Sequence, residues 1–147
     1  MIETKLKKIK DLQLKVSSSA LKRIEEGFHG NGCGSGPISK GVCGFLQRIV
    51  GGDFTIVWDI HDSEYTESRA TKTATKKIIA DSNLYYNINT IMGINDEVPQ
   101  RFKRTFARWL YVTLILGGHN AYWEVKSKLP SVHTWILWGI LIYLLTG

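Results

Sequence analysis

The chain has 147 residues, enough for one domain with a modest hydrophobic core. Its 44% hydrophobic and 22% charged residues are ordinary for a globular protein, and only two cysteines exclude a small domain built on a disulfide framework. The formal net charge of +6 favours anionic partners: phospholipid headgroups, an acidic protein surface or nucleic acid. Nucleic acid is the weakest of these, because only the net charge supports it.

The first segment, residues 1–28, is predicted to be a basic N-terminal helix. Apolar residues recur at helical spacing over residues 3–26, with an interruption at Ser17–Ser19, and Gly27 is a typical stop signal. Lysines fill the remaining positions. The segment lacks the apolar centre and cleavage site of a secretory signal peptide, so none is predicted.

Residues 29–44 are rich in glycine and contain Pro37, which favours an irregular loop over a helix or strand. The loop includes Cys33 and ends next to Cys43. The two thiols could form one bridge that closes the loop, or stay reduced, and the sequence leaves this open.

Three further helices are predicted after the loop. The first starts at Asp53 as N-cap, and its residues Phe54, Val57, Ile60, His61 and Tyr65 share one helical face. The β-branched run Thr55–Val57 offers a strand as the alternative. The second covers residues 73–92, stops at Gly93, and has Ile78, Ile79, Leu84, Ile88 and Ile91 as its apolar members. The third starts at Pro99 and ends or kinks at Gly117–Gly118, with its arginines facing outward.

An apolar C-terminal helix is predicted over residues 130–147, where Trp135–Leu145 carries no charge. A membrane-spanning helix needs roughly 20 apolar residues, and this run is shorter. It therefore favours a core or assembly helix, or an interfacial anchor with Trp135, Trp138 and Tyr143 at the headgroup level. A full transmembrane helix is the third choice.

The residues with the clearest chemistry are His61, Asp62 and Tyr65, followed by Asp81 on the next helix. If the two helices pack antiparallel, Asp81 accepts the Nδ1 hydrogen of His61 and leaves Nε2 as a base. Asp62 is then left to bind a cation. Calcium prefers carboxylate and backbone carbonyl oxygens, and the loop could supply the carbonyls of Gly32, Gly34 and Gly36.

The sequence Cys33-Gly34-Ser35-Gly36, followed by His61-Asp62-x-x-Tyr65 and then Ala80-Asp81, resembles the phospholipase A2 superfamily, and in its spacing the compact viral type. The stretch from Trp58 to Trp123 is also similar to a group of bacteriophage proteins. The resemblance implies a calcium site at Asp62, Gly32, Gly34 and Gly36, with His61 as the catalytic base supported by Asp81 and Tyr65.

The sequence therefore predicts a mostly α protein with a phospholipase A2-like antiparallel helix pair and a glycine-rich metal loop in a core of residues 29–125. We expect a calcium-dependent phospholipase acting at a phospholipid membrane, located in a virion or at a host membrane. The alternative is a non-enzymatic virion or membrane-associated protein that uses the C-terminal helix to form a homo-oligomer or bind virion proteins. A zinc site of His29, Cys33, Cys43 and His61 is a weaker interpretation.

Overall fold

The computed structural model describes part of the chain, and that part is helical, without strands. The described residues are 1–30, 44, 47–48, 54–67, 70–94, 99–118, 122–123, 138–142 and 145, except for the side chains of 113–117. The main elements are α1 (Ile2–Asp11), α2 (Ser18–Glu25), α4 (Phe54–Tyr65), α5 (Ala74–Ile94) and α6 (Gln100–Gly117). The prediction of a mostly α protein is confirmed.

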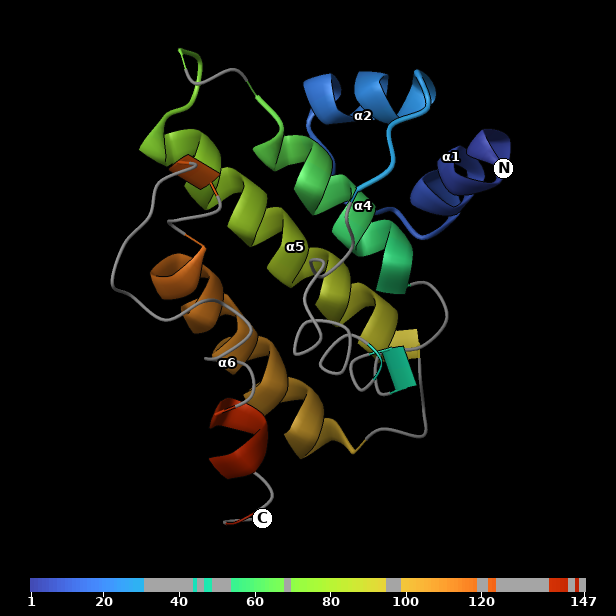
Figure 1. The fold of residues 1–147 in the computed structure, drawn as a ribbon. Helices are drawn as coiled ribbons and strands as arrows, with labels where there is room; N and C mark the ends of the chain where they lie inside the picture. The colour runs from blue at the N-terminus through green and yellow to red at the C-terminus, as the bar shows by residue number, and fades with distance from the viewer. Residues whose placement is uncertain are drawn as a thin grey trace.

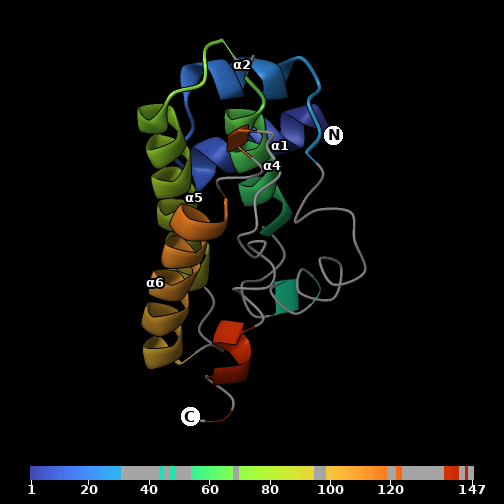
Figure 2. The same cartoon turned by 60° about the vertical axis from the view of Figure 1, so that its left-hand side comes forward.

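The helices α4, α5 and α6 form an up-down-up arrangement (Figure 1). α5 packs against α4 on one side and α6 on the other, and α2 packs on both α1 and α4. Figure 2 shows α5 and α6 side by side, with α1 and α2 next to α4. The predicted antiparallel packing of the second helix on the first is therefore present as α4 and α5.

The N-terminal segment forms two helices. The predicted interruption is at Ser17–Ser19, whereas in the structure α1 ends at Asp11 and α2 begins at Ser18. The chain leaves α1 after Asp11 and turns through Gln13, whose φ of 52° is in the left-handed region. Ser17 then caps α2, its side chain accepting a hydrogen bond from the Ala20 amide. The serines thus start the second helix rather than interrupting one long helix. Gly27, at φ 96°, follows the end of α2 as predicted.

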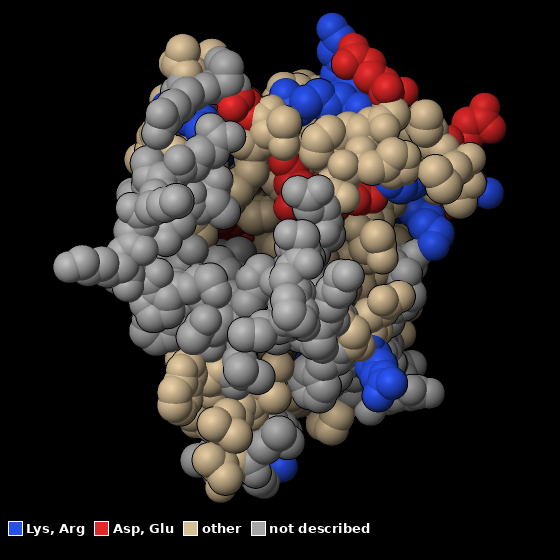
Figure 3. Space-filling model, viewed as in Figure 1, with Lys and Arg blue, Asp and Glu red and all other residues tan. Residues whose placement is uncertain are grey.

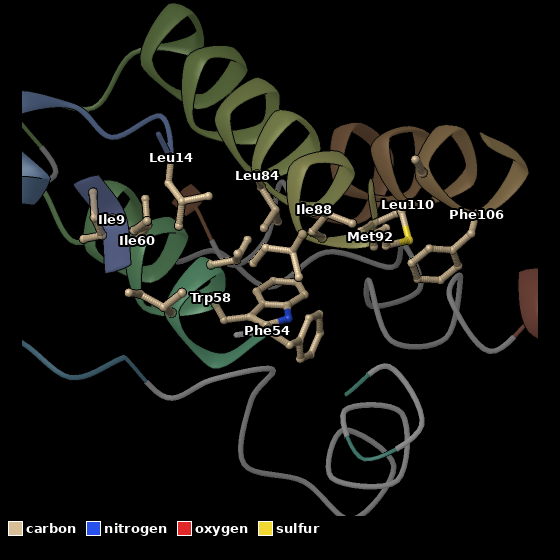
Figure 4. Packing of buried hydrophobic residues seen from close by; sticks show 14 of the residues in the cluster. Ile9, Leu14, Phe54, Trp58, Ile60, Leu84, Ile88, Met92, Phe106 and Leu110 are labelled. Atoms are coloured by element: carbon tan, nitrogen blue, oxygen red, sulfur yellow. The ribbon is translucent and has the colours of Figure 1, made fainter. Parts of the chain in front are cut away.

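One hydrophobic core joins all five helices (Figure 4). Ile9 of α1 and Leu14 of the following turn point toward α4, and Leu84 and Ile88 of α5 meet α4 from its other side. The core continues along α5 to Met92 and reaches α6 through residues including Phe106 and Leu110. α1 and α2 are therefore built into the same core as the helices that follow the loop.

α4 is a helix, as predicted, but it is buried on nearly every side instead of one face. Besides the predicted apolar face, the structure buries Ile56, Trp58, Asp59, Ser63 and Glu64. The reason is its position between α5 and the N-terminal helices. Its predicted N-cap, Asp53, lies outside the described residues.

Two expectations for α5 are wrong. Ile78 and Ile79 are 55% and 49% exposed, although their spacing placed them on the apolar face. The face turned toward α4 instead includes Lys77 and Asp81, two polar residues that stabilise each other in the interior. The helix also continues through Gly93 and ends at Ile94.

α6 begins directly after Pro99, as predicted, and Arg101, Arg104 and Arg108 are exposed. The described C-terminal residues 138–142 are helical. Gly139 lies against the Trp109 indole, where a Cβ would overlap the ring, and Ile140 packs on the core. No described helix is both long and apolar enough to cross a bilayer.

Candidate functional site

α4 and α5 bring three of the predicted site residues together. Nε2 of His61 lies 3.2 Å from Oδ1 of Asp81, and the Tyr65 hydroxyl donates to the same oxygen at 2.5 Å. His61 and Asp81 are 4% and 1% exposed, so this contact is shielded from water. Tyr65 lies one helical turn after His61 on α4, and the centroids of their rings are 4.1 Å apart.

The predicted roles of the two imidazole nitrogens are reversed. Asp81 contacts Nε2 of His61, whereas the sequence argument assigned that contact to Nδ1. Nδ1 is buried and has no hydrogen-bond partner among the described residues. Because Asp81 is an ionised acceptor, the contact places the imidazole hydrogen on Nε2 and the lone pair on Nδ1. Nδ1 is therefore the ring nitrogen that carries the lone pair, and it is buried.

Asp81 is held as a carboxylate by its neighbours. Burial raises its pKa, but the donors His61, Lys77 and Tyr65 together lower the pKa of Asp81 below its ordinary value. Lys77 donates to Oδ2 at 2.6 Å from one helical turn earlier on α5. Burial and the adjacent Asp81 charge raise the pKa of Tyr65, which keeps its hydroxyl protonated and able to donate.

The start of the glycine-rich segment is fixed against α4. The Gly30 amide donates to Oδ1 of the buried Asp59 at 3.1 Å, and Lys5 of α1 binds the other Asp59 oxygen at 2.5 Å. Lys5 also lies 3.0 Å from Nδ1 of His29. A Cβ on Gly30 would be 2.5 Å from Oδ2 of Asp62, so only glycine fits here without displacement. The chain therefore enters the predicted metal loop in contact with Asp62.

Aromatic residues enclose the pair from α4 and from beyond α6. The Trp58 ring stands edge-on to His61, with centroids 5.6 Å apart. Tyr122 is fully buried, packs on Tyr65 at 5.0 Å and donates through its hydroxyl to the Thr73 carbonyl. These contacts fix both rings that approach Asp81.

Glu64 is a second buried carboxyl on α4, with a structural role. Its Oε1 accepts from the Ser17 amide at 2.9 Å and from Nδ2 of Asn83 at 2.8 Å. Burial raises the pKa of Glu64, although both hydrogen bonds oppose that shift. Glu64 thereby joins the start of α2 to α4 and α5.

Several predicted residues lie outside the described part of the chain: Gly32, Gly34, Gly36, Cys33, Cys43, Trp135 and Tyr143. Trp138 is described and is 55% exposed. Within the described ranges, no three or more His, Cys, Asp and Glu side chains are grouped to hold a metal ion. The predicted calcium ligands include one such side chain, Asp62.

Sequence reasoning missed Lys77, Asp59, Lys5 and Gly30. Lys77 could have been found, because it precedes Asp81 by four residues and therefore shares its helical face. No local pattern indicates the pairing of Lys5 with Asp59, which are 54 positions apart.

Comparisons with protein-family models, curated proteins and solved structures found no match. The resemblance to phospholipase A2 therefore rests on the sequence motifs of this chain alone.

Proposed function

We propose that the protein is a calcium-dependent phospholipase A2-like hydrolase that cleaves an ester bond of a glycerophospholipid. The observation that carries the proposal is the His61–Asp81 contact, which is buried and leaves Nδ1 as the nitrogen with the lone pair. A neutral imidazole oriented by a carboxylate is a suitable general base near neutral pH.

The Asp62 carboxylate would supply oxygen ligands for a hard cation, and the other predicted ligands, Gly32, Gly34 and Gly36, lie outside the described residues. Asp62 supplies carboxylate oxygens, and Gly30 brings the backbone into contact with them at the point where the glycine-rich segment begins. Calcium accepts mixtures of carboxylate and carbonyl oxygens, and the carbonyls predicted for this site are those of Gly32, Gly34 and Gly36. Bound there, it would polarise the ester carbonyl and stabilise the negative charge of the tetrahedral intermediate.

The protein's own part of the reaction follows from His61. Nδ1 takes a proton from a water molecule as the water oxygen attacks the ester carbonyl carbon. The resulting imidazolium is stabilised by Asp81 through Nε2. His61 then returns the proton to the departing alcohol oxygen, which gives a fatty acid and a lysophospholipid. Tyr65 and Trp58 keep the imidazole in position throughout.

The experiment measures fatty-acid release from vesicles of mixed zwitterionic and anionic phospholipids, with calcium or with a chelator. We expect release only with calcium, and a loss of about 10²- to 10⁴-fold for His61→Asn, the range typical of a general base. Tyr65→Phe removes a hydrogen bond to Asp81 and should lower the release, whereas the control Tyr86→Phe, at a side chain 39% exposed on the same helix as Asp81, should not. No release by the wild-type protein with calcium, or full activity of His61→Asn, would contradict the proposal.

A second candidate is a non-enzymatic protein of a virion or membrane that assembles through its C-terminus. It is favoured by the exposure of four apolar C-terminal side chains: Trp138, Leu141, Ile142 and Leu145. Figure 3 shows acidic and basic side chains mixed over α1 and α2, so the described surface of these two helices in this view is not uniformly basic. Deletion after Pro130 separates the candidates: loss of assembly without hydrolysis in either form supports the second, and a hydrolytic soluble monomer supports the first.

A further inference from the structure

The outward side of α6 carries a row of arginines. Arg101, Arg104 and Arg108 follow one another at spacings of three and four residues, so they share one face of the helix, and all three are exposed. Among the described residues, none of them forms an ion pair with an acidic side chain. A guanidinium stays charged at every pH that a protein tolerates, so this row is permanently positive.

The described C-terminal segment, residues 138–142, lies beside this row. Gly139 contacts the indole of Trp109, the residue that follows Arg108, and Ile140 packs on the core. Figures 1 and 2 both show the segment next to α6. Its inward side is therefore fixed by Gly139 and Ile140.

The outward side of the same segment is apolar. Trp138, Leu141 and Ile142 are spaced as one helical face and are 55%, 43% and 48% exposed. On α6, Val112 follows Arg108 by one helical turn and is 45% exposed. We call the arginine row together with these four apolar side chains the arginine–apolar face.

Acidic residues are missing from this part of the sequence. α6 contains none, and the only one between residues 99 and 147 is Glu124, which lies outside the described residues. In the view of Figure 3, the acidic side chains lie in the upper half of the molecule, and the described surface below them is basic or uncharged. A partner of the arginine–apolar face must therefore offer negative charge and apolar surface together.

An anionic bilayer is the partner that meets both requirements. Its phosphates carry negative charge at the surface, and its hydrocarbon begins directly below them. Arginine can keep its guanidinium at the phosphates while its methylene groups extend along apolar material, and tryptophan favours the headgroup level. A second copy of the chain would bring arginines against arginines, and nucleic acid would leave the aliphatic side chains facing phosphates.

We propose that the arginine–apolar face docks on an anionic phospholipid surface, with its arginines at the headgroup phosphates and Trp138 and Leu141 inserted between the headgroups. The inference goes beyond the proposed function, because it concerns attachment to the membrane and not hydrolysis. It can be measured with a chelator present, when no calcium-dependent cleavage takes place.

The test is co-sedimentation of the full-length protein with vesicles of phosphatidylcholine, alone or mixed with phosphatidylglycerol. We expect tighter binding to the mixed vesicles, weakened by added salt. Replacement of all three arginines by glutamine should lower the partition coefficient by about 10²-fold, since each cation near an anionic surface contributes about fivefold. The matched control replaces Lys7, Lys10 and Lys22, which are exposed on α1 and α2, by glutamine. It removes the same charge and should reduce binding far less.

Two single variants complete the test. Leu141→Gln should weaken binding to both kinds of vesicle, whereas Ile79→Gln, at an aliphatic side chain 49% exposed on α5, should not. Arg104→Gln alone should cost about fivefold, which keeps the test decisive if the triple arginine variant does not fold.

Several results would overturn the proposal. One is an absence of wild-type binding to the mixed vesicles, and another is an equal loss in the lysine control, which would show a response to net charge alone. Tighter binding to DNA or to polyglutamate than to the mixed vesicles would assign the face to that partner. A dimer without lipid that Leu141→Gln dissociates would assign it to a second copy. Docking without any fatty-acid release in calcium would refute the proposed function and leave this inference standing.

Discussion

Replacement of Gly30 by alanine tests whether the glycine-rich segment enters the site against Asp62. The added Cβ would lie 2.8 Å from the Asp62 Cβ, whereas ordinary contacts begin at 3.4 Å. Because the α4 backbone holds the Asp62 Cβ, Gly30 has to retreat by about 0.6 Å. That movement stretches the 3.1 Å hydrogen bond from the Gly30 amide to Asp59 beyond favourable geometry.

The expected loss is about 1–3 kcal/mol of unfolding free energy. A lost hydrogen bond to a charged acceptor is typically about 1.5–3 kcal/mol, and overpacking of a methyl group is about 1–3 kcal/mol. The two are alternative ways of relieving one clash, so they do not add.

Urea unfolding followed by circular dichroism measures this loss, with Gly93→Ala as the matched control. Gly93 lies within α5, and among the described residues no atom outside its neighbours and the local helix backbone lies within 4 Å of the position that an added methyl group would take. Alanine there should leave stability unchanged or raise it by up to about 1 kcal/mol. A ligand that binds the native state raises the free energy of unfolding. Under the proposed function, calcium should raise it more in the wild-type protein than in Gly30→Ala, because the added methyl group meets Asp62. Wild-type stability in Gly30→Ala would refute the close approach to Asp62.

Two other changes probe the buried charges. Lys5→Met leaves the Asp59 carboxylate, which is 5% exposed, without its cation and should lower the free energy of unfolding by about 2–4 kcal/mol. The control Lys7→Met, at an exposed position of the same helix, should not. Equal urea midpoints for the two variants would contradict the pairing. Folding lowers the pKa of Asp81 below its ordinary value of 3.8, so the ionised Asp81 stabilises the folded protein. This stabilisation is fully present above pH 3.8 and is lost as the pH falls through the lower pKa of the folded state. Urea midpoints between about pH 5 and about pH 2 should therefore fall more steeply for the wild-type protein than for Asp81→Asn, and parallel slopes would count against this linkage.

Local patterns predicted the parts of the fold that depend on neighbours in sequence. The helix from Phe54 to Tyr65 and the start of α6 after Pro99 follow from helical spacing and from the fixed φ of proline. His61 and Tyr65 share a face for the same reason. The meeting of His61 with Asp81 needed one further assumption, an antiparallel packing of α4 and α5.

The failures have a common cause: tertiary contacts decide which face of a helix is buried. On α5, apolar spacing favoured Ile78 and Ile79, but the face against α4 carries Lys77 and Asp81, whose pairing makes their burial tolerable. The choice of imidazole nitrogen likewise depends on the ring's orientation against Trp58, which the sequence does not contain. The pairing of Lys5 with Asp59 requires α1 to cross α4.

The buried polar groups of α4 can be sorted by what the fold needs. Glu64 accepts a hydrogen bond from the Ser17 amide at the start of α2. Apolar packing cannot satisfy a buried backbone amide, so this contact has a structural role. The His61–Asp81 pair connects α4 to α5, which Ile60, Leu84 and other core residues already hold together. Apolar residues in place of such a buried pair are often equally or more stabilising. A scaffold does not need this pair for its stability, whereas the proposed reaction uses an imidazole base oriented by a carboxylate, and this difference supports the proposed function.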